Sequence, residues 1–231
     1  MMKINRPLAV LAMLVLLGGV FAAFMGGTPA VSQYPPVIDG DILVGEYQYR
    51  CTVDASKRTP GATFKMDMYW TIDGEFIYVG LKAPTKGWVG WGLMPLVPTS
   101  ANPKAGVADI VIGYVTEGNK LTIEDSYADG NFGHKPDTAF GGKNDIAKAA
   151  GREIVEGGTT FTIVEFQRKL YTQDRYDVAV PVRMEVYLAY SDADDLTTQH
   201  KGSGEGRAHR DINFVTGKVA VPRVDWACTG G

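Results

Sequence analysis

Apolar and polar positions alternate in short runs along most of the chain after residue 45. A period of two is typical of β-strands with one buried face, and few segments have the 3.6-residue period of a helix. The pattern predicts strands over residues 46–53, 63–72, 76–81, 88–93, 109–115, 121–127, 159–166, 183–190 and 210–216.

Turn residues separate these runs at frequent intervals. Asp73-Gly74 lies between two apolar runs and predicts a tight hairpin, because both residue types tolerate the positive φ of such a turn. Strands with one apolar face must bury that face against a second sheet. The pattern therefore predicts an all-β sandwich.

Two longer segments interrupt the alternation. Residues 95–107 contain Pro95, Pro98 and Pro103, which exclude a central strand, and residues 128–152 are rich in Gly and Asp. Long loops on a rigid β-scaffold commonly carry binding groups. Both segments are expected to be loops that contribute to a site.

The first thirty residues differ from the rest in composition. Lys3 and Arg6 precede an uncharged apolar run over residues 8–25. A basic start followed by an apolar helix is typical of an export signal, and a run of about 20 residues is also long enough to cross a bilayer. The sequence leaves a cleaved signal peptide and a retained membrane anchor open. Either places the remainder outside the cytoplasm.

The chain is expected to hold one folded domain. Residues 1–30 form the signal or anchor, residues 31–45 a linker and lead-in, and residues 46–231 the β-sandwich. A domain of about 200 residues is within the range of one large sandwich with a single core.

Charge and motifs exclude several classes of function. The net charge is -3 and no run of Lys or Arg follows Arg6, so the electrostatic basis for binding nucleic acid is missing. The sequence has no GxSxG, P-loop or HExxH motif and no recognisable nucleophile with its base. A binding module is therefore predicted rather than an enzyme.

The two cysteines, Cys51 and Cys228, lie near opposite ends of the predicted domain. In an oxidising space outside the cytoplasm, a disulfide between them is the favoured interpretation, and a pair of buried thiols is the alternative. Two cysteines are too few for a Cys-rich zinc site. They are also too far apart in the sequence to form the CxxCH motif that attaches haem covalently.

Motifs in a fixed order along the chain resemble the DOMON domain family. They are VIDG (37–40), YWTIDGE (69–75), APTKGWVGWG (83–92), ADIVIGYV (108–115), GGKNDI (141–146), VEFQRKL (164–170), YLAYS (187–191) and QHKGSG (199–204). The resemblance implies an extracytoplasmic, immunoglobulin-like sandwich of about ten antiparallel strands that binds haem b or a sugar.

The resemblance also implies a pair of haem ligands. In haem-binding members a Met from the loop after the Gly-Trp strand and a His late in the domain hold the iron. His200 matches the second position, but about Ala105 stands where the Met is expected, and the nearest Met is Met94. His134, in the second long segment, is the other candidate for the second ligand.

The residues around these candidates suit a haem slot. Trp88 and Trp91 stand in an apolar stretch beside the first long segment, and a noncovalent haem needs an apolar slot with an imidazole or sulfur ligand. The simpler alternative is that both tryptophans pack on alternate faces and that His200 is a solvated loop residue. His209 is expected to be structural or exposed.

Three functions remain in order of preference. The first is a haem b module that passes electrons to a membrane or extracytoplasmic redox partner. The second is a carbohydrate-binding module in which Trp88, Trp91 and Tyr127 stack on sugar rings. The third is a structural role at the cell surface. A calcium site on Asp192, Asp194 and Asp195 is less favoured than solvated loop charge.

Overall fold

The computed structural model describes residues 35–57, 60–94, 108–128, 133–201, 205–218 and 227–230. The apolar run over residues 8–25 and the segment 95–107 lie outside this part of the chain. Within the described part, no helix has the length and apolar character needed to cross a membrane.

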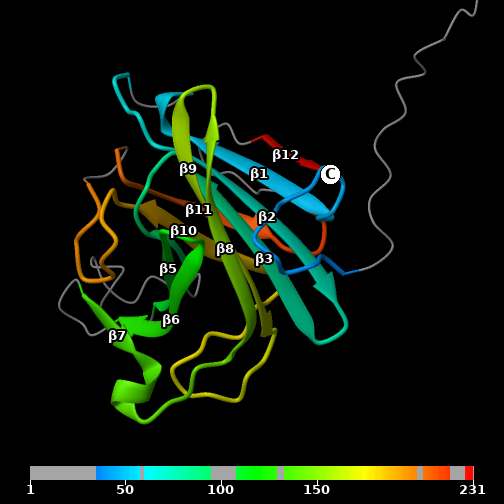
Figure 1. Cartoon of the computed structure of the whole chain (residues 1–231). Helices are drawn as coiled ribbons and strands as arrows, with labels where there is room; N and C mark the ends of the chain where they lie inside the picture. The colour runs from blue at the N-terminus through cyan, green and yellow to red at the C-terminus, as the bar shows by residue number, and fades with distance from the viewer. Residues whose placement is uncertain are drawn as a thin grey trace, which may run out of the picture.

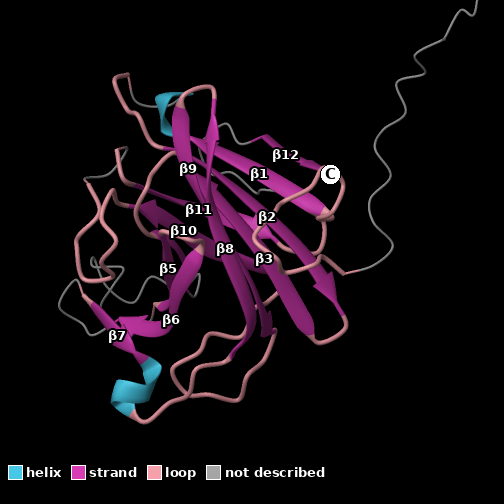
Figure 2. Cartoon of the chain, viewed as in Figure 1, coloured by secondary structure: helices cyan, strands magenta, loops and turns pink. Residues whose placement is uncertain are grey.

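Two antiparallel six-stranded sheets pack face to face (Figures 1 and 2). The first has the order β12-β1-β2-β3-β9-β8 and the second the order β11-β10-β4-β5-β6-β7. The first contains β1 (Tyr49–Asp54), β2 (Lys65–Asp73), β3 (Phe76–Ala83), β8 (Ile146–Glu156), β9 (Thr159–Lys169) and β12 (Ala227–Gly230). The second contains β4 (Val89–Met94), β5 (Asp109–Thr116), β6 (Lys120–Ala128), β7 (His134–Pro136), β10 (Arg183–Tyr190) and β11 (Arg207–Asn213). The predicted all-β sandwich of antiparallel strands is confirmed.

Two 3-10 helices complete the described elements, η1 (Ala55–Lys57) and η2 (Asp137–Phe140). The second follows β7 directly, and the left-handed Gly141 ends it. This short turn directs the chain from the edge of the second sheet to β8 at the edge of the first sheet.

The core lies between the two sheets and follows the predicted alternation. On β4, Val89, Trp91 and Leu93 point into the core, where the Trp91 ring packs edge-on against Phe166 of β9 at 5.5 Å. Burying each large apolar side chain contributes about 1.5–3 kcal/mol. The intervening Gly90 and Gly92 consequently lie on the outer face of the second sheet.

The hairpin predicted at Asp73-Gly74 forms one residue later than expected. Asp73 pairs with Phe76 as the last rung of β2 and β3, so Gly74 and Glu75 make the turn. Gly74 has φ of 57°, which glycine adopts without the clash that a Cβ causes. The register that results sets Trp70 opposite Val79.

Residues 133–152 hold more regular structure than the sequence predicts. They include β7, η2 and the first part of β8, which pairs along β9 with an irregularity between Ile146 and Lys148. Because β8 is an edge strand, much of it is exposed and carries charges such as Lys148 and Glu153, which hide the apolar alternation of a strand.

The lead-in before β1 packs on the first sheet. Glu165 of β9 accepts hydrogen bonds from the backbone N–H of Gly40 at 2.6 Å and from the Tyr47 hydroxyl at 2.6 Å. Burial raises the pKa of Glu165, and these donors lower it in part. Residues 37–47 are thus held by a specific buried contact and belong to the folded domain.

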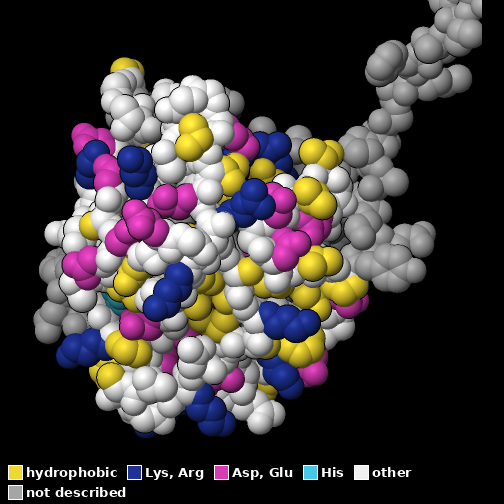
Figure 3. Space-filling model, in the orientation of Figure 1, with side chains coloured by type: hydrophobic (Ala, Val, Ile, Leu, Met, Phe, Trp, Pro, Cys, Tyr) yellow, Lys and Arg dark blue, Asp and Glu magenta, His cyan; other side chains and the backbone are white. Residues whose placement is uncertain are grey.

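The visible face of the first sheet has a mixed charge. Figure 3 shows Lys and Arg side chains interspersed with Asp and Glu over this face, with hydrophobic side chains between them. Lys82 pairs with Glu156 at 2.7 Å and Lys169 with Glu75 at 3.1 Å. Such exposed pairs contribute little to stability, at about 0–1 kcal/mol each.

The strand register aligns the two cysteines. Cys51 of β1 lies directly opposite Cys228 of β12, and its own side chain is buried. Residues directly opposite in an antiparallel pair have Cβ atoms about 4.5–5.5 Å apart, and a small adjustment of the strands reaches the disulfide range of about 3.5–4.5 Å. The disulfide stays a prediction that this register supports.

We expect the exported protein to resist thiol alkylation, even after denaturation, until a reductant is added. Intact mass spectrometry then shows two added alkyl groups. Cys228→Ser is expected to lower the free energy of unfolding by about 2–4 kcal/mol, because the bridge closes a long loop in the unfolded chain. Alkylation of both cysteines in denatured, unreduced protein contradicts the disulfide.

Candidate functional site

A cavity of about 420 Å³ lies on the outer face of the second sheet. Its floor comes from β10, β4 and β5, and its walls come from residues 196–200 and from the start of β7. Four of the predicted site residues line it together: Trp88, Trp91, His134 and His200. The tryptophans are distant in sequence from the histidines, and the fold brings them to one place.

The floor of the cavity is flat because β4 has glycine at its outward positions. A Cβ added at Gly90 would lie 3.4 Å from the Trp88 ring, and one at Gly92 would lie 3.5 Å from the Tyr187 Cβ. The neighbouring outward residues, Ile110 and Tyr187, are apolar or aromatic. The result is an apolar slot over the sheet.

Trp88 fixes the loop that forms the upper wall. Its backbone N–H donates to Ala193 O at 3.1 Å, its backbone carbonyl accepts from Ser191 N–H at 3.1 Å, and its Nε1–H donates to Thr198 O at 3.0 Å. A Cβ at Gly87 would overlap the backbone of residues 191 and 193, so only glycine permits this approach. The loop is therefore built onto the sheet.

His200 stands in this wall beside Trp88, with the two rings edge-to-face at a centroid distance of 6.4 Å. Its Nδ1 lies 2.6 Å from Lys201 O. Because a carbonyl only accepts, Nδ1 carries the proton, and in the neutral ring the lone pair is on Nε2. A histidine ligand is usually oriented in this way, through a hydrogen bond from its other nitrogen.

His134 lies on another side of the cavity and has a different environment. Its Nε2 is 3.0 Å from Leu196 O, so this nitrogen donates to the wall loop. Its buried Nδ1 faces Glu124 Oε1 at 3.7 Å. His134 therefore fastens the loop, and its Nε2 must leave Leu196 before it can bind a metal.

The remaining histidine, tryptophan and methionine candidates lie in different environments. Trp91 borders the cavity, but its ring is buried in the core against Phe166, so the packing interpretation holds for it. Met94 is the last residue of β4, opposite Glu185, and its side chain lies outside the described set. His209 is exposed and stacks on Tyr187 at 5.0 Å, consistent with the expected structural role.

A second polar constellation is buried between the sheets. Arg168 of β9 binds Asp109 of β5 through Nη1, at 3.0 Å and 2.8 Å from its two carboxylate oxygens, and its Nη2 lies 3.4 Å from Asp177. All three side chains are at most 1% exposed. Sequence reasoning missed this group as a site, although Asp109 and Arg168 both lie in motifs of the DOMON resemblance.

Burial changes the titration of the acids in this region. It raises the pKa of Asp109 to about 6, with Arg168 opposing the rise. It also raises the pKa of Asp125 to about 7 and that of Asp137 to about 8, in both cases with the neighbouring carboxylates adding to the effect of burial. In all three acids burial is the largest cause of the rise.

Comparison with known families agrees with this architecture. The DOMON domain family matches residues 63–193, more than half of the chain. The chain belongs to the DOMON domain family. The match spans strands β2 to β10, which carry Trp88, His134 and the buried Arg168.

Among solved structures, the chain is similar to the crystal structure of the cytochrome b domain of pyranose dehydrogenase from Coprinopsis cinerea. It has 10% sequence identity and a TM-score of 0.37, covering 64% of this chain and 75% of that chain. Among curated proteins, no match was found.

The buried Arg168 generates a stability prediction for this DOMON domain. We expect Arg168→Met to lower the free energy of unfolding by about 3–5 kcal/mol, because it leaves Asp109 and Asp177 as buried carboxylates without a cation. Urea unfolding followed by tryptophan fluorescence measures the loss.

The neighbouring Lys169→Met is the matched control, since its partner Glu75 is exposed and the pair is worth about 0–1 kcal/mol. If Arg168→Met does not fold, Arg168→Lys keeps the charge and gives an intermediate loss. Equal losses for Arg168→Met and Lys169→Met contradict the assigned role of the buried pair.

Proposed function

We propose that this DOMON domain binds haem b in the cavity on the outer face of the second sheet and serves as an electron-transfer module rather than an enzyme. The observation that carries the proposal is the position of His200. It stands in the wall of an apolar slot, with Nδ1 committed to Lys201 O and the lone pair on Nε2.

The residues present fit a haem. The cavity of about 420 Å³ is within the usual range of about 300–1,000 Å³ for ligand sites. The glycines of β4 and the side chains of Ile110 and Ile112 offer a flat apolar surface to a porphyrin ring. Arg207 at the same cavity is a cation that suits the carboxylate of a haem propionate.

The domain's own residues have separate roles in this proposal. His200 would bind the haem iron, Trp88 contacts the His200 ring edge-to-face, and the carbonyl of Thr198 accepts a hydrogen bond that holds Trp88 in place. Residues 196–200 form one wall of the slot. A bound haem supplies a one-electron couple, and ligand identity and burial set its potential.

Met94 and His134 are the two candidates for the second haem ligand. His134 already lines the cavity, and its use as a ligand requires the Nε2 contact with Leu196 O to break. Its other nitrogen would then face Glu124, a carboxylate that increases the basicity of the ring. We propose His200 as the first ligand and His134 or Met94 as the second.

Carbohydrate binding has less support. A sugar-stacking tryptophan needs an accessible ring face, whereas Trp88 is only 4% exposed and Trp91 is fully buried. The Nε1–H of Trp88 is also committed to Thr198. An apolar slot for a flat cofactor suits these residues better than an open stacking platform.

The proposal includes a location outside the cytoplasm. The basic start and the apolar run over residues 8–25 support export, and a retained run would hold the domain at the membrane surface. At that surface a membrane or extracytoplasmic redox partner is within reach.

The visible spectrum of the protein purified from haem-supplied cells tests the proposal. We expect a Soret band whose intensity corresponds to about one haem per chain. His200→Ala is expected to lower the haem content about tenfold, because the bond from the ligand to the iron holds a noncovalent cofactor. His134→Ala is expected to keep the haem and to change its spectrum and potential if His134 is the second ligand.

His209→Ala is the matched control, because His209 is not among the described residues that line the cavity and its loss should leave haem content unchanged. The proposal is overturned by protein that carries no Soret band, or by a band that His200→Ala leaves intact. Recovery of a tightly held sugar from the purified protein would favour the carbohydrate alternative.

A further inference from the structure

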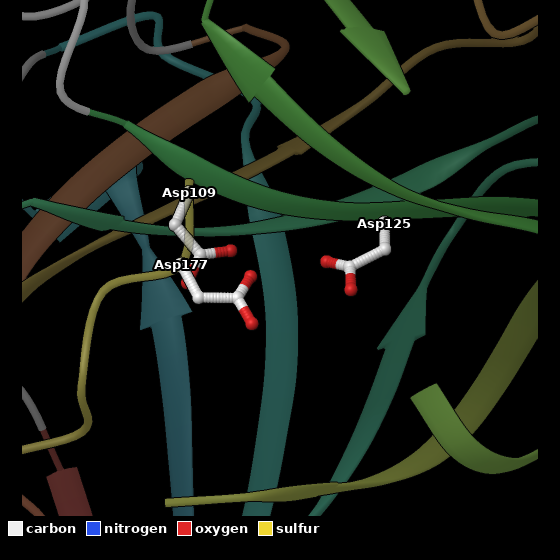
Figure 4. Close-up of side chains that lie close together, drawn as sticks. All are labelled: Asp109, Asp125 and Asp177. Atoms are coloured by element: carbon white, nitrogen blue, oxygen red, sulfur yellow. The ribbon is translucent and has the colours of Figure 1, made fainter. Parts of the chain in front are cut away.

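Three carboxylates meet in the interior at the start of β5. Asp109 comes from β5, Asp125 from β6 and Asp177 from the segment between β9 and β10. One oxygen from each lies within 4.8 Å of the others, and Figure 4 shows the three groups directed toward a common space. This set together with Asp137 is called the acidic cluster below.

In the described part of the chain, the carboxylates of the acidic cluster outnumber the cations that contact them. Arg168 donates to both oxygens of Asp109, and the backbone N–H of Val178 also donates to Asp109 at 2.8 Å. Asp109 is thus well satisfied. The contact of Asp177 with Arg168 is longer, at 3.4 Å, and no cation contacts Asp125 among the residues described.

Several oxygens of the cluster accept no hydrogen bond from the described part of the chain. Oδ1 of Asp125 and both carboxylate oxygens of Asp177 are buried, and within the described chain no hydrogen bond reaches them. The other oxygen of Asp125 accepts from the backbone N–H of Asp145 at 2.7 Å, which fixes the direction of the carboxylate. Unpaired buried carboxylates are costly, so a ligand for them is expected.

Asp137 is an independent observation that points to the same space. It is fully buried, and neither of its carboxylate oxygens has a hydrogen-bond partner in the described part of the chain. Ser126 pairs with Pro136, so the next residue on each strand sets Asp137 beside Asp125. Burial raises the pKa of Asp137, and the carboxylates of Asp125, Asp177 and Asp109 add to the rise.

The geometry suits a hard divalent cation. Ca²⁺ takes about six to eight oxygen ligands at about 2.3–2.6 Å, so oxygens within 4.8 Å of one another can share a single ion. The carboxylates come from separate segments, as in a site that ties loops together. Two of them are oriented by backbone N–H donors, Val178 and Asp145, and such outer contacts fix metal ligands.

We infer that the acidic cluster of Asp109, Asp125, Asp137 and Asp177 is a binding site for one Ca²⁺ ion. The cation coordinates the carboxylate oxygens that accept no hydrogen bond. It thereby holds the segment 170–182 and η2 against the second sheet. This inference does not depend on haem, because the cluster lies on the core side of β5 and the cavity on the other side.

An aromatic group beside the cluster offers a spectroscopic probe. Tyr127, Phe140 and Tyr176 pack together, with ring centroids 5.4–6.3 Å apart. Tyr127 follows Asp125 on β6, and Phe140 is in the same short helix as Asp137. A Tb³⁺ ion in the calcium site should therefore be sensitised by tyrosine excitation.

The test uses the full chain after removal of metals with a chelator. We expect calorimetric titration with CaCl₂ to give one ion per chain, with a dissociation constant of about 1 mM or tighter, and thermal unfolding to shift upward with added Ca²⁺. Tyrosine-sensitised Tb³⁺ emission should appear and should be displaced by Ca²⁺. MgCl₂ is expected to bind more weakly, because Mg²⁺ requires a near-ideal octahedral site.

Asp125→Asn and Asp177→Asn are expected to weaken Ca²⁺ binding by about tenfold or more while near-ultraviolet circular dichroism stays native. Asp194→Asn, a substitution of an exposed loop carboxylate, is the matched control and should leave the affinity unchanged. If one of the cluster variants fails to fold, Asp137→Asn supplies the same comparison.

Two outcomes overturn the inference. One is the absence of any heat, Tb³⁺ emission or thermal shift with CaCl₂ up to about 10 mM, well above the range of extracellular calcium modules. The other is Ca²⁺ binding that the Asn variants leave intact, which would locate the ion elsewhere on the chain. Neither outcome bears on the visible spectrum, so the haem proposal is tested separately.

Discussion

The buried bond between Arg168 and Asp109 joins the two sheets of this DOMON domain. Arg168 is a buried residue near the end of β9 in the first sheet, and Asp109 is the first residue of β5 in the second sheet. A charge placed between sheets is stable only with complete pairing, so both strands must keep their positions. The same pair also orients Asp177 and the backbone of Val178, which brings the segment 170–182 against the sandwich.

Strand β5 consequently separates two different environments. Its inward residues, such as Asp109 and Val111, meet the other sheet, whereas Ile110 and Ile112 form the floor of the cavity. The period of two along one strand thus places a charged cluster and an apolar slot on opposite faces. Because both share the same backbone, a displacement of β5 would alter the acidic cluster and the cavity together.

The walls of the cavity depend on close backbone packing more than on side-chain chemistry. Gly87 lets the chain before β4 touch residues 191–193, and Trp88 then holds the loop through three hydrogen bonds. His200 takes its orientation from this arrangement and from the carbonyl of Lys201. The close backbone contact at Gly87 and the hydrogen bonds of Trp88 together hold a surface loop in place as the wall of the cavity.

Strand alternation, the Gly74 turn and the ordered DOMON motifs are local properties, so the sequence by itself determined the sandwich, the family and the candidates Trp88, His134 and His200. Only the tertiary structure decided that these three share a cavity, that Trp91 belongs to the core, and that the charged edge strand β8 forms. Asp109 and Arg168 are 59 residues apart, and no local pattern announces such a partnership. Pairing at that distance follows from how the two sheets pack, because burial removes water as an alternative partner for each charge.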